Sequence, residues 1–131
     1  MTGNDGQSAA HPRLLVVDDE LELRTLLAMK FSKSGFSVDV AATGAEAAEF
    51  LSREKYSAIV CDLNLPENMN GCDVYKIAKT HCVDCTFIAI TGYAPDSPQV
   101  QNARAAGIPH VFSKPLQMKA ILEIVYQEKS A

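Results

Sequence analysis

Hydrophobic positions in this chain form four short continuous runs, separated by stretches with helical periodicity. The runs occupy Leu14–Val17, Ala58–Cys61, Phe87–Ile90 and, more weakly, His110–Ser113. Continuous apolar runs of this length are typical of strands buried on both faces of a parallel sheet. A fifth predicted strand, Phe36–Ala41, alternates between apolar and polar residues instead. The alternation of strands with helical stretches indicates βαβ units.

The stretches between the runs carry signals for the starts and ends of helices. Thr43–Glu46 matches a capping box, and Ser97–Pro98 supplies an N-cap followed by proline. Gly35 and Gly107 are placed as helix C-terminal stops, and Pro115 is predicted to open the last helix. The expected fold is therefore α/β and flavodoxin-like, a doubly wound (βα)5 arrangement around a five-stranded parallel sheet.

Length and charge narrow the class of protein. A chain of 131 residues fits one domain, expected at 13–131 after a polar, disordered leader at 1–12. The net charge of −4 argues against a nucleic-acid partner, and no apolar stretch is long enough to span a bilayer. The leader lacks the features of a signal peptide, so we expect a cytoplasmic protein without a membrane partner.

The four cysteines leave two readings open. Cys61 closes an apolar run and is interpreted as a small buried hydrophobic residue. Cys82 and Cys85 have the spacing of redox or metal-ligand pairs, and a zinc site would need two more ligands, for which His81 and Cys72 are nearest. Because the chain has one such pair, on a predicted loop, the favoured interpretation is a loop with reduced cysteine thiols that bind no metal.

Polar residues suited to phosphoryl chemistry follow the predicted strands. The first strand runs into Asp18 and Asp19, the third into Asp62, the fourth into Thr91 and the fifth into Lys114. Because parallel sheets gather ligands at the carboxyl ends of their strands, we expect these side chains to form one pocket. Each residue taken alone has a simpler explanation. The aspartates could be solvated loop ends, and Lys114 could be an ordinary solvated lysine.

The pocket would combine a metal site with a nucleophile. Three carboxylates this close repel one another unless a hard cation lies between them, and Mg2+ binds carboxylates together with phosphate oxygens. Asp62 is the candidate nucleophile, since a carboxylate can attack phosphorus to form an acyl phosphate. Lys114 would contact a phosphoryl oxygen as a point charge, and Thr91 would donate its hydroxyl to another.

The order of these motifs resembles the receiver domain of two-component response regulators. The resemblance covers roughly residues 13–127 and rests on Leu-Val-Val-Asp-Asp at 15–19, Asp-Leu-Asn-Leu-Pro at 62–66 with Gly71, Thr-Gly at 91–92, Ala-Ala-Gly at 105–107 and Lys-Pro at 114–115. It implies that Asp62 is the phosphoacceptor and Asp19 the direct Mg2+ ligand. Asp18 would act through water, and Asn64 would lend its backbone carbonyl to the metal.

The same resemblance implies a partner and a switch. The phosphoryl donor would be a phosphohistidine on a histidine kinase or a histidine phosphotransfer protein, and phosphorylation would change binding to an unidentified downstream protein. Thr91 and Lys114 resemble the switch hydroxyl and the phosphate-binding lysine. The usual aromatic switch position, three residues before the lysine, holds Val111, so Tyr93 or a shifted Phe112 would have to supply an aromatic ring.

Two other functions compete with a signalling receiver. An aspartate-nucleophile phosphatase of the haloacid-dehalogenase type normally needs a second aspartate two residues after the nucleophile, and that position is Asn64. A degenerate receiver would bind partners without phosphorylation, which the presence of all the key residues disfavours.

The stretch from Asp62 to Gly71 is one residue longer than the usual family spacing, so a bulged loop is expected.

Overall fold

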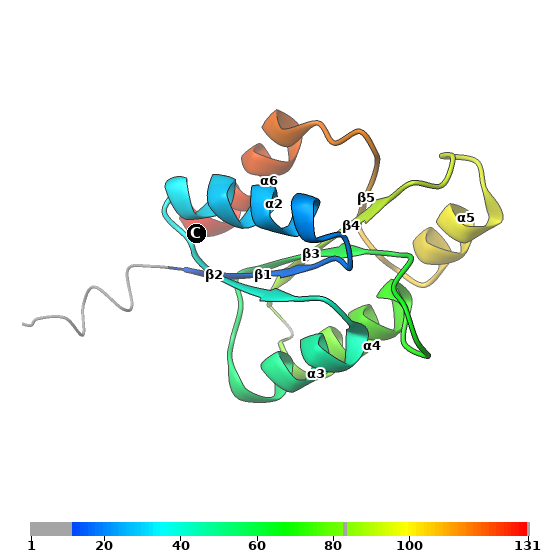
Figure 1. Ribbon diagram of the computed structural model, residues 1–131, viewed down its shortest axis with the longest axis horizontal. Coiled ribbons are helices and arrows are strands. Elements are labelled where there is room, and N and C mark those ends of the chain that lie inside the picture. The colour runs from blue at the N-terminus through cyan, green and yellow to red at the C-terminus, as the bar shows by residue number, and fades with distance from the viewer. Residues whose placement is uncertain (1–11, 83, 131) are drawn as a thin grey trace, which may run out of the picture.

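The computed structural model describes residues 12–130 except Val83, with side chains described as far as Gln127. Residues 1–11, which make up most of the predicted leader, lie outside the described residues. Figure 1 shows the alternating elements, which are β1 (Arg13–Val17), α2 (Leu21–Lys33), β2 (Ser37–Ala41), α3 (Gly44–Arg53), β3 (Ala58–Asp62), α4 (Gly71–His81), β4 (Thr86–Thr91), α5 (Pro98–Ala105), β5 (His110–Ser113) and α6 (Met118–Ser130).

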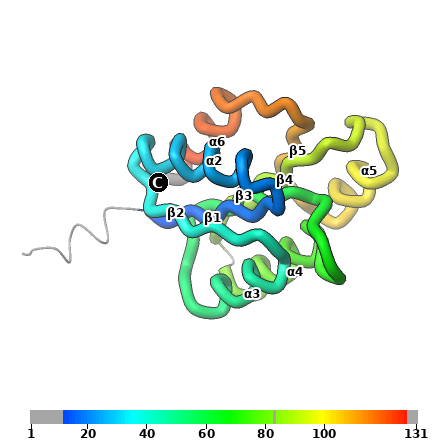
Figure 2. The backbone as a smooth tube through the Cα atoms, in the orientation of Figure 1, coloured from blue at the N-terminus to red at the C-terminus, as the bar shows by residue number. Residues whose placement is uncertain are grey.

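The described strands form one parallel sheet with the order β2-β1-β3-β4-β5. Helices α2 and α6 cover one face, whereas α3 and α4 cover the other (Figure 1). Ala103 of α5 belongs to the α3–α4 layer, and Figure 2 shows this helix at the β5 end of the molecule. The predicted doubly wound α/β fold is confirmed.

The continuous apolar runs are buried on both sides, as their composition predicts. In β1, Leu14 and Val16 pack in the α2–α6 layer, whereas Leu15 and Val17 pack in the α3–α4 layer, and all four are fully buried. This two-sided burial explains why the run shows no polar alternation. In the described part of the chain, no helix combines the length and apolar character needed to cross a bilayer.

Two predicted helix starts are confirmed and one is wrong. The hydroxyl of Thr43 accepts a hydrogen bond from the Glu46 amide at the start of α3, and that of Ser97 caps α5. The last helix begins at Met118 rather than at Pro115, and the Lys114–Pro115 peptide bond before it is cis. The backbone carbonyl of Gln117 accepts the first hydrogen bonds of α6, so the helix starts after this residue.

The other differences from the predicted elements lie around β2 and α4. Strand β2 begins at Ser37, because the Phe36 amide donates to the carbonyl of Phe31 and so completes the end of α2. Helix α4 begins with a capping box between Asn70 and Asp73 that the sequence analysis missed.

Gly71 lets α4 start directly against the end of β3. A Cβ atom at this position would lie 2.5 Å from the Asp62 carbonyl oxygen and 2.7 Å from Leu63 Cα. Both neighbours are backbone atoms, so the clash cannot be relieved by a side-chain rotation. The chain thus passes from the strand end to α4 through a contact that only glycine permits.

We expect Gly71→Ala to lower the free energy of unfolding by about 1–3 kcal/mol, the usual range for forced overpacking. Gly92→Ala is the matched control, because a Cβ there meets no heavy atom of the described residues within 4 Å. Urea denaturation of both variants measures the difference. Equal stabilities would show that the Asp62–Gly71 loop can move aside without cost.

Candidate functional site

The strand register brings the predicted site residues to one edge of the sheet. Val17 pairs with Cys61, Asp62 with Ile90, and Thr91 with Ser113, so the residues that follow these strands emerge together. An open cavity of about 410 Å3 lies at this edge. It is lined by Asp19, Glu20, Asp62, Asn64, Gly92, Tyr93 and Lys114.

Lys114 is the centre of charge in the site. Its Nζ atom lies 2.8 Å from Asp62 Oδ2, 2.8 Å from Glu20 Oε1 and 3.5 Å from Asp18 Oδ2. Burial by itself would lower the pKa of this ammonium, but the hydrogen bonds to Asp62 and Glu20 raise it above the ordinary lysine value. The lysine therefore stays charged and available to anions.

Asp62 presents a buried carboxylate held at both oxygens. The residue is 3% exposed and is the last residue of β3. Its Oδ1 atom accepts a hydrogen bond of 2.8 Å from the backbone N–H of Asn64, and its Oδ2 atom accepts one of 2.8 Å from Nζ of Lys114. The carboxylate is thus oriented toward the cavity by contacts on two sides.

Asp18 is a fully buried carboxylate with one oxygen lacking a hydrogen bond. Its Oδ1 atom accepts from the Glu20 backbone amide at 2.7 Å. Among the described residues, Oδ2 has no hydrogen-bond partner and lies 3.5 Å from Lys114 Nζ. Desolvation raises the pKa of this group to about 6, the Glu20 amide opposes that shift, and the charge of Asp62 adds to it. The guanidinium of Arg24 donates to the Asp18 carbonyl at 2.8 Å and so holds the loop in place.

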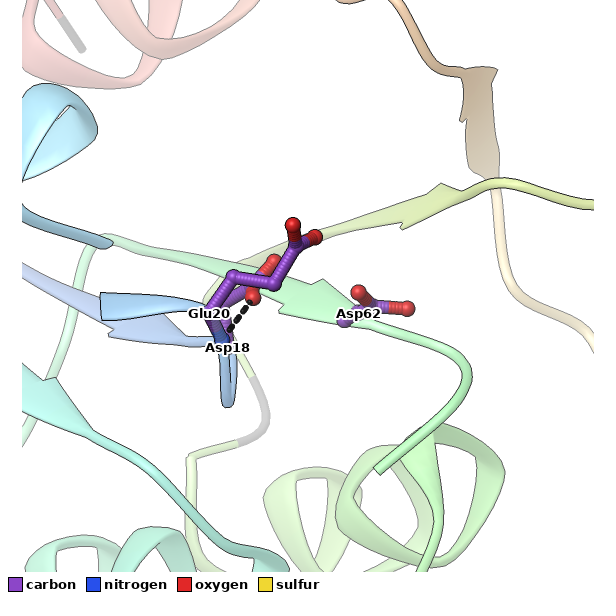
Figure 3. A group of neighbouring side chains, drawn as sticks. All are labelled: Asp18, Glu20 and Asp62. Atoms are coloured by element: carbon purple, nitrogen blue, oxygen red, sulfur yellow. Dashed lines mark hydrogen bonds between the residues drawn. The ribbon is translucent and has the colours of Figure 1, made fainter. Parts of the chain in front are cut away.

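Asp18, Glu20 and Asp62 can hold a divalent metal ion. One oxygen from each lies within 4.8 Å of the others, and Figure 3 shows the side chains at the ends of β1 and β3. Asp18 Oδ2 supports this fit, since among the described residues this buried oxygen has an ion pair of 3.5 Å to Lys114 but no hydrogen bond, and a metal ion could coordinate it. Sequence reasoning missed Glu20, although an acidic residue directly after the Asp18–Asp19 pair was a usable signal.

The two other predicted metal ligands lie at the cavity without joining this group of three. Asp19 is exposed and lines the cavity, and its role as the direct ligand stays a prediction. Asn64 also lines the cavity, and its backbone N–H donates a hydrogen bond to the Asp62 carboxylate. The backbone carbonyl contribution of Asn64 likewise stays a prediction.

Thr91 lies behind the cavity rather than on its wall. It is fully buried, and its hydroxyl accepts a hydrogen bond of 3.0 Å from the Tyr93 amide. Its carbonyl accepts a 2.7 Å hydrogen bond from the Lys114 amide, so the backbones of the two predicted switch residues are linked. Tyr93 lies on the cavity wall next to them.

Neighbouring residues of β5 point to opposite faces of the sheet. Val111 packs in the α3–α4 layer, whereas Phe112 packs in the α2–α6 layer. A one-residue slip of the strand would be needed for Phe112 to take the position of Val111, and such a slip would reverse every side chain of β5. Of the two aromatic residues considered as substitutes, Tyr93 is the one that lies at the cavity.

The described lining of the cavity contains no cysteine. Cys61 is fully buried, as predicted. The thiol of Cys82 donates to the Tyr56 carbonyl and accepts from the Tyr56 amide, which joins the end of α4 to the start of β3. Within the described residues, neither Cys82 nor Cys85 belongs to a group of three potential metal ligands.

Comparison with known proteins shows which family the chain belongs to. Residues 14–126 match the family model described as the response regulator receiver domain. Sporulation initiation phosphotransferase F of Bacillus subtilis is 27% identical over 113 residues, covering 86% of this chain and 90% of that protein. Response regulator receiver protein CpdR of Brucella abortus is 30% identical over 115 residues, covering 84% and 90%.

Solved structures agree in fold. A CheY-like receiver domain protein of Methanospirillum hungatei superposes with a TM-score of 0.81 at 25% identity, over 92% of this chain and 94% of the other. A response regulator protein of Burkholderia pseudomallei superposes with a TM-score of 0.79 at 25% identity, over 91% of this chain and 69% of the other. The latter structure contains a phosphorylated aspartic acid, a calcium ion and citrate.

Proposed function

The chain belongs to the response regulator receiver domain family of two-component signalling, and from that premise we propose that Asp62 is its phosphoacceptor. The observation that carries the proposal is the Asp62 carboxylate itself. It is buried at the end of β3, held by Lys114 and by the Asn64 amide, and lies on the wall of an open cavity.

In the proposed reaction, a carboxylate oxygen of Asp62 attacks the phosphorus of a phosphohistidine. The bond between phosphorus and the histidine nitrogen breaks as the acyl phosphate bond forms, and the donor keeps the electron pair on its imidazole. Lys114, already 2.8 Å from Asp62, neutralises charge on the transferred group. The donor would be a histidine kinase or a histidine phosphotransfer protein, and the chain acts as a phosphoacceptor rather than as an enzyme with turnover.

We propose Mg2+ as the cofactor, bound by Asp18, Asp19 and Asp62 together with the Asn64 carbonyl. The buried Asp18 Oδ2 atom, which has no hydrogen bond among the described residues, supports a metal ion here, as does the calcium ion in the Burkholderia pseudomallei structure. When bound, the metal supplies positive charge opposite the phosphoryl oxygens.

The domain at 13–131 would work in the cytoplasm and pass its state to a downstream protein. Thr91 and Lys114 are the proposed switch, since their backbones are already joined by a hydrogen bond. The leader at 1–12 stays a prediction, because all of it but Pro12 lies outside the described residues.

One experiment separates a receiver from the two competing functions. The protein is incubated with acetyl phosphate and Mg2+, and its intact mass is followed over time. A receiver gains one phosphoryl group that then decays slowly. A haloacid-dehalogenase-type phosphatase would release inorganic phosphate from the acetyl phosphate continuously, and a degenerate receiver would show neither a gain in mass nor release of phosphate.

Tyr93 is expected to prolong the life of the acyl phosphate. Hydrolysis needs a water in line with the phosphoryl group. Tyr93 and Asn64 both line the cavity around Asp62, and Tyr93 is the bulkier. Tyr93→Ala should therefore shorten the phosphorylated half-life several-fold, and Asn64→Ala should change it less. Decay of the purified phosphoprotein measures both, and an equal or longer half-life in Tyr93→Ala would refute the shielding role.

A further inference from the structure

The Glu20 carboxylate shares Lys114 with the proposed phosphoacceptor. Glu20 Oε1 and Asp62 Oδ2 each lie 2.8 Å from Lys114 Nζ, and Asp18 lies within ion-pair distance of the same atom. A lysine ammonium has three N–H donors. A phosphoryl group on Asp62 therefore meets a cation that is already surrounded by carboxylates.

The three carboxylates differ in how easily their side chains can move away from Lys114. Asp18 is fully buried and tied to the Glu20 amide, and Asp62 is buried and tied to the Asn64 amide. The Glu20 side chain is 63% exposed, and Lys114 is the one hydrogen-bond partner of its carboxylate among the described residues. Water can rehydrate Glu20 when it moves, since exposed ion pairs are weak.

We propose that Glu20 is a displaceable anion that occupies Lys114 and slows phosphorylation by small anionic phosphodonors. The proposal rests on the function proposed above and adds a specificity-determining residue to it. An incoming phosphoryl group takes the place of Glu20 on the ammonium, and the Glu20 carboxylate moves into solvent. Until then, its charge at the cavity wall repels a small anion that approaches Asp62.

The size of the effect follows from one unit charge at short range. The carboxylate oxygens of Glu20 and Asp62 are within 4.8 Å of each other, so an incoming phosphoryl group passes Glu20 at a comparable distance. Removing one charge at such a distance from a water-facing site is worth about threefold to tenfold in rate. The effect should shrink at high ionic strength, where the screening length falls to about 3 Å.

The test compares Glu20→Gln with Glu22→Gln in the full chain. Glu22 is an exposed acid in the first turn of α2, so its replacement removes the same charge from the neighbouring surface. With acetyl phosphate and Mg2+ at low salt, Glu20→Gln should be phosphorylated about threefold to tenfold faster than the parent, and Glu22→Gln within about twofold of it. The gain should shrink toward parity in 1 M salt. Both variants are compared at Mg2+ concentrations that saturate them, as followed by thermal shift, because removing the Glu20 carboxylate also weakens the attraction for the cation.

Slower phosphorylation of Glu20→Gln together with weaker Mg2+ binding would make Glu20 a metal ligand and overturn the proposal. A rate equal to that of the parent would overturn it as well. A parent protein that binds Mg2+ but gains no phosphoryl group would refute the proposed function itself. If the parent is phosphorylated and Glu20→Gln is phosphorylated at the same rate, this inference alone is refuted and the proposed function stands.

Discussion

Asp62→Asn is expected to abolish phosphorylation of the protein by acetyl phosphate and Mg2+. An amide is a far weaker nucleophile than a carboxylate, so the variant cannot form the acyl phosphate. The shape of the site should survive, because the Asn64 amide can still donate to the side-chain oxygen that takes the place of Asp62 Oδ1. Intact-mass measurement should show one added phosphoryl group on the parent and none on the variant.

Asp84→Asn is a suitable control for the same measurement. Asp84 is an exposed aspartate outside the cavity, so its replacement makes the same chemical change without touching the site. This variant should be labelled as fully as the parent. Equal labelling of Asp62→Asn would place the phosphoryl group on another residue and remove the basis of the proposed function.

Asp18→Asn is expected to weaken divalent metal binding at least tenfold and to stabilise the protein in metal-free buffer. The Asp18 carboxylate is fully buried, and its Oδ2 atom has no hydrogen bond to any of the residues that the structure describes. At neutral pH this group is charged at a cost in free energy that a metal ion would offset. Neutralising it removes both the cost and the ligand.

The pH dependence gives the sign and size of this cost. The pKa of Asp18 is about 6 in the folded protein against the ordinary 3.8, chiefly because of desolvation. The folded chain therefore binds more protons than the unfolded chain between these pH values, and stability falls as the pH rises through about 6. The difference corresponds to about 3 kcal/mol. Because the variant also loses attraction to Lys114, we expect a net gain of about 1–2 kcal/mol at pH 7.5, or about 4–8 °C in Tm.

Thermal melts with and without Mg2+ measure both effects. The parent should be less stable at pH 7.5 than at pH 5 without metal, and Mg2+ should raise its Tm. Asp18→Asn should show neither response, whereas Asp84→Asn should show both. A variant that keeps the full Mg2+ shift would mean that Asp18 is not needed for the metal.

Much of the fold followed from local sequence pattern. The runs of β1, β3 and β4 are continuous because helices cover both faces of these strands, and such runs are distinctive in any sequence. The caps at Thr43 and Ser97 are short-range signals and were correctly located. The start of α6 was not, because Leu116 packs in the α2–α6 layer and the helix begins only after Gln117.

The chain order of Asp18, Asp62 and Lys114 at strand ends was enough to predict a shared acidic site beside a lysine, because parallel strands end at one edge. The role of Glu20 was decided by tertiary structure. The loop after β1 brings its carboxylate to an ammonium 94 positions along the chain. An acidic residue beside the Asp18–Asp19 pair is visible in the sequence, but its contact with Lys114 depends on how the loop folds. Tertiary packing also buried Thr91 behind the cavity and left Tyr93 on its wall. The sequence by itself determined which residues reach this edge, through hydrophobic pattern and strand order. Which of them face the cavity, and which share Lys114, depended on side-chain packing between distant segments.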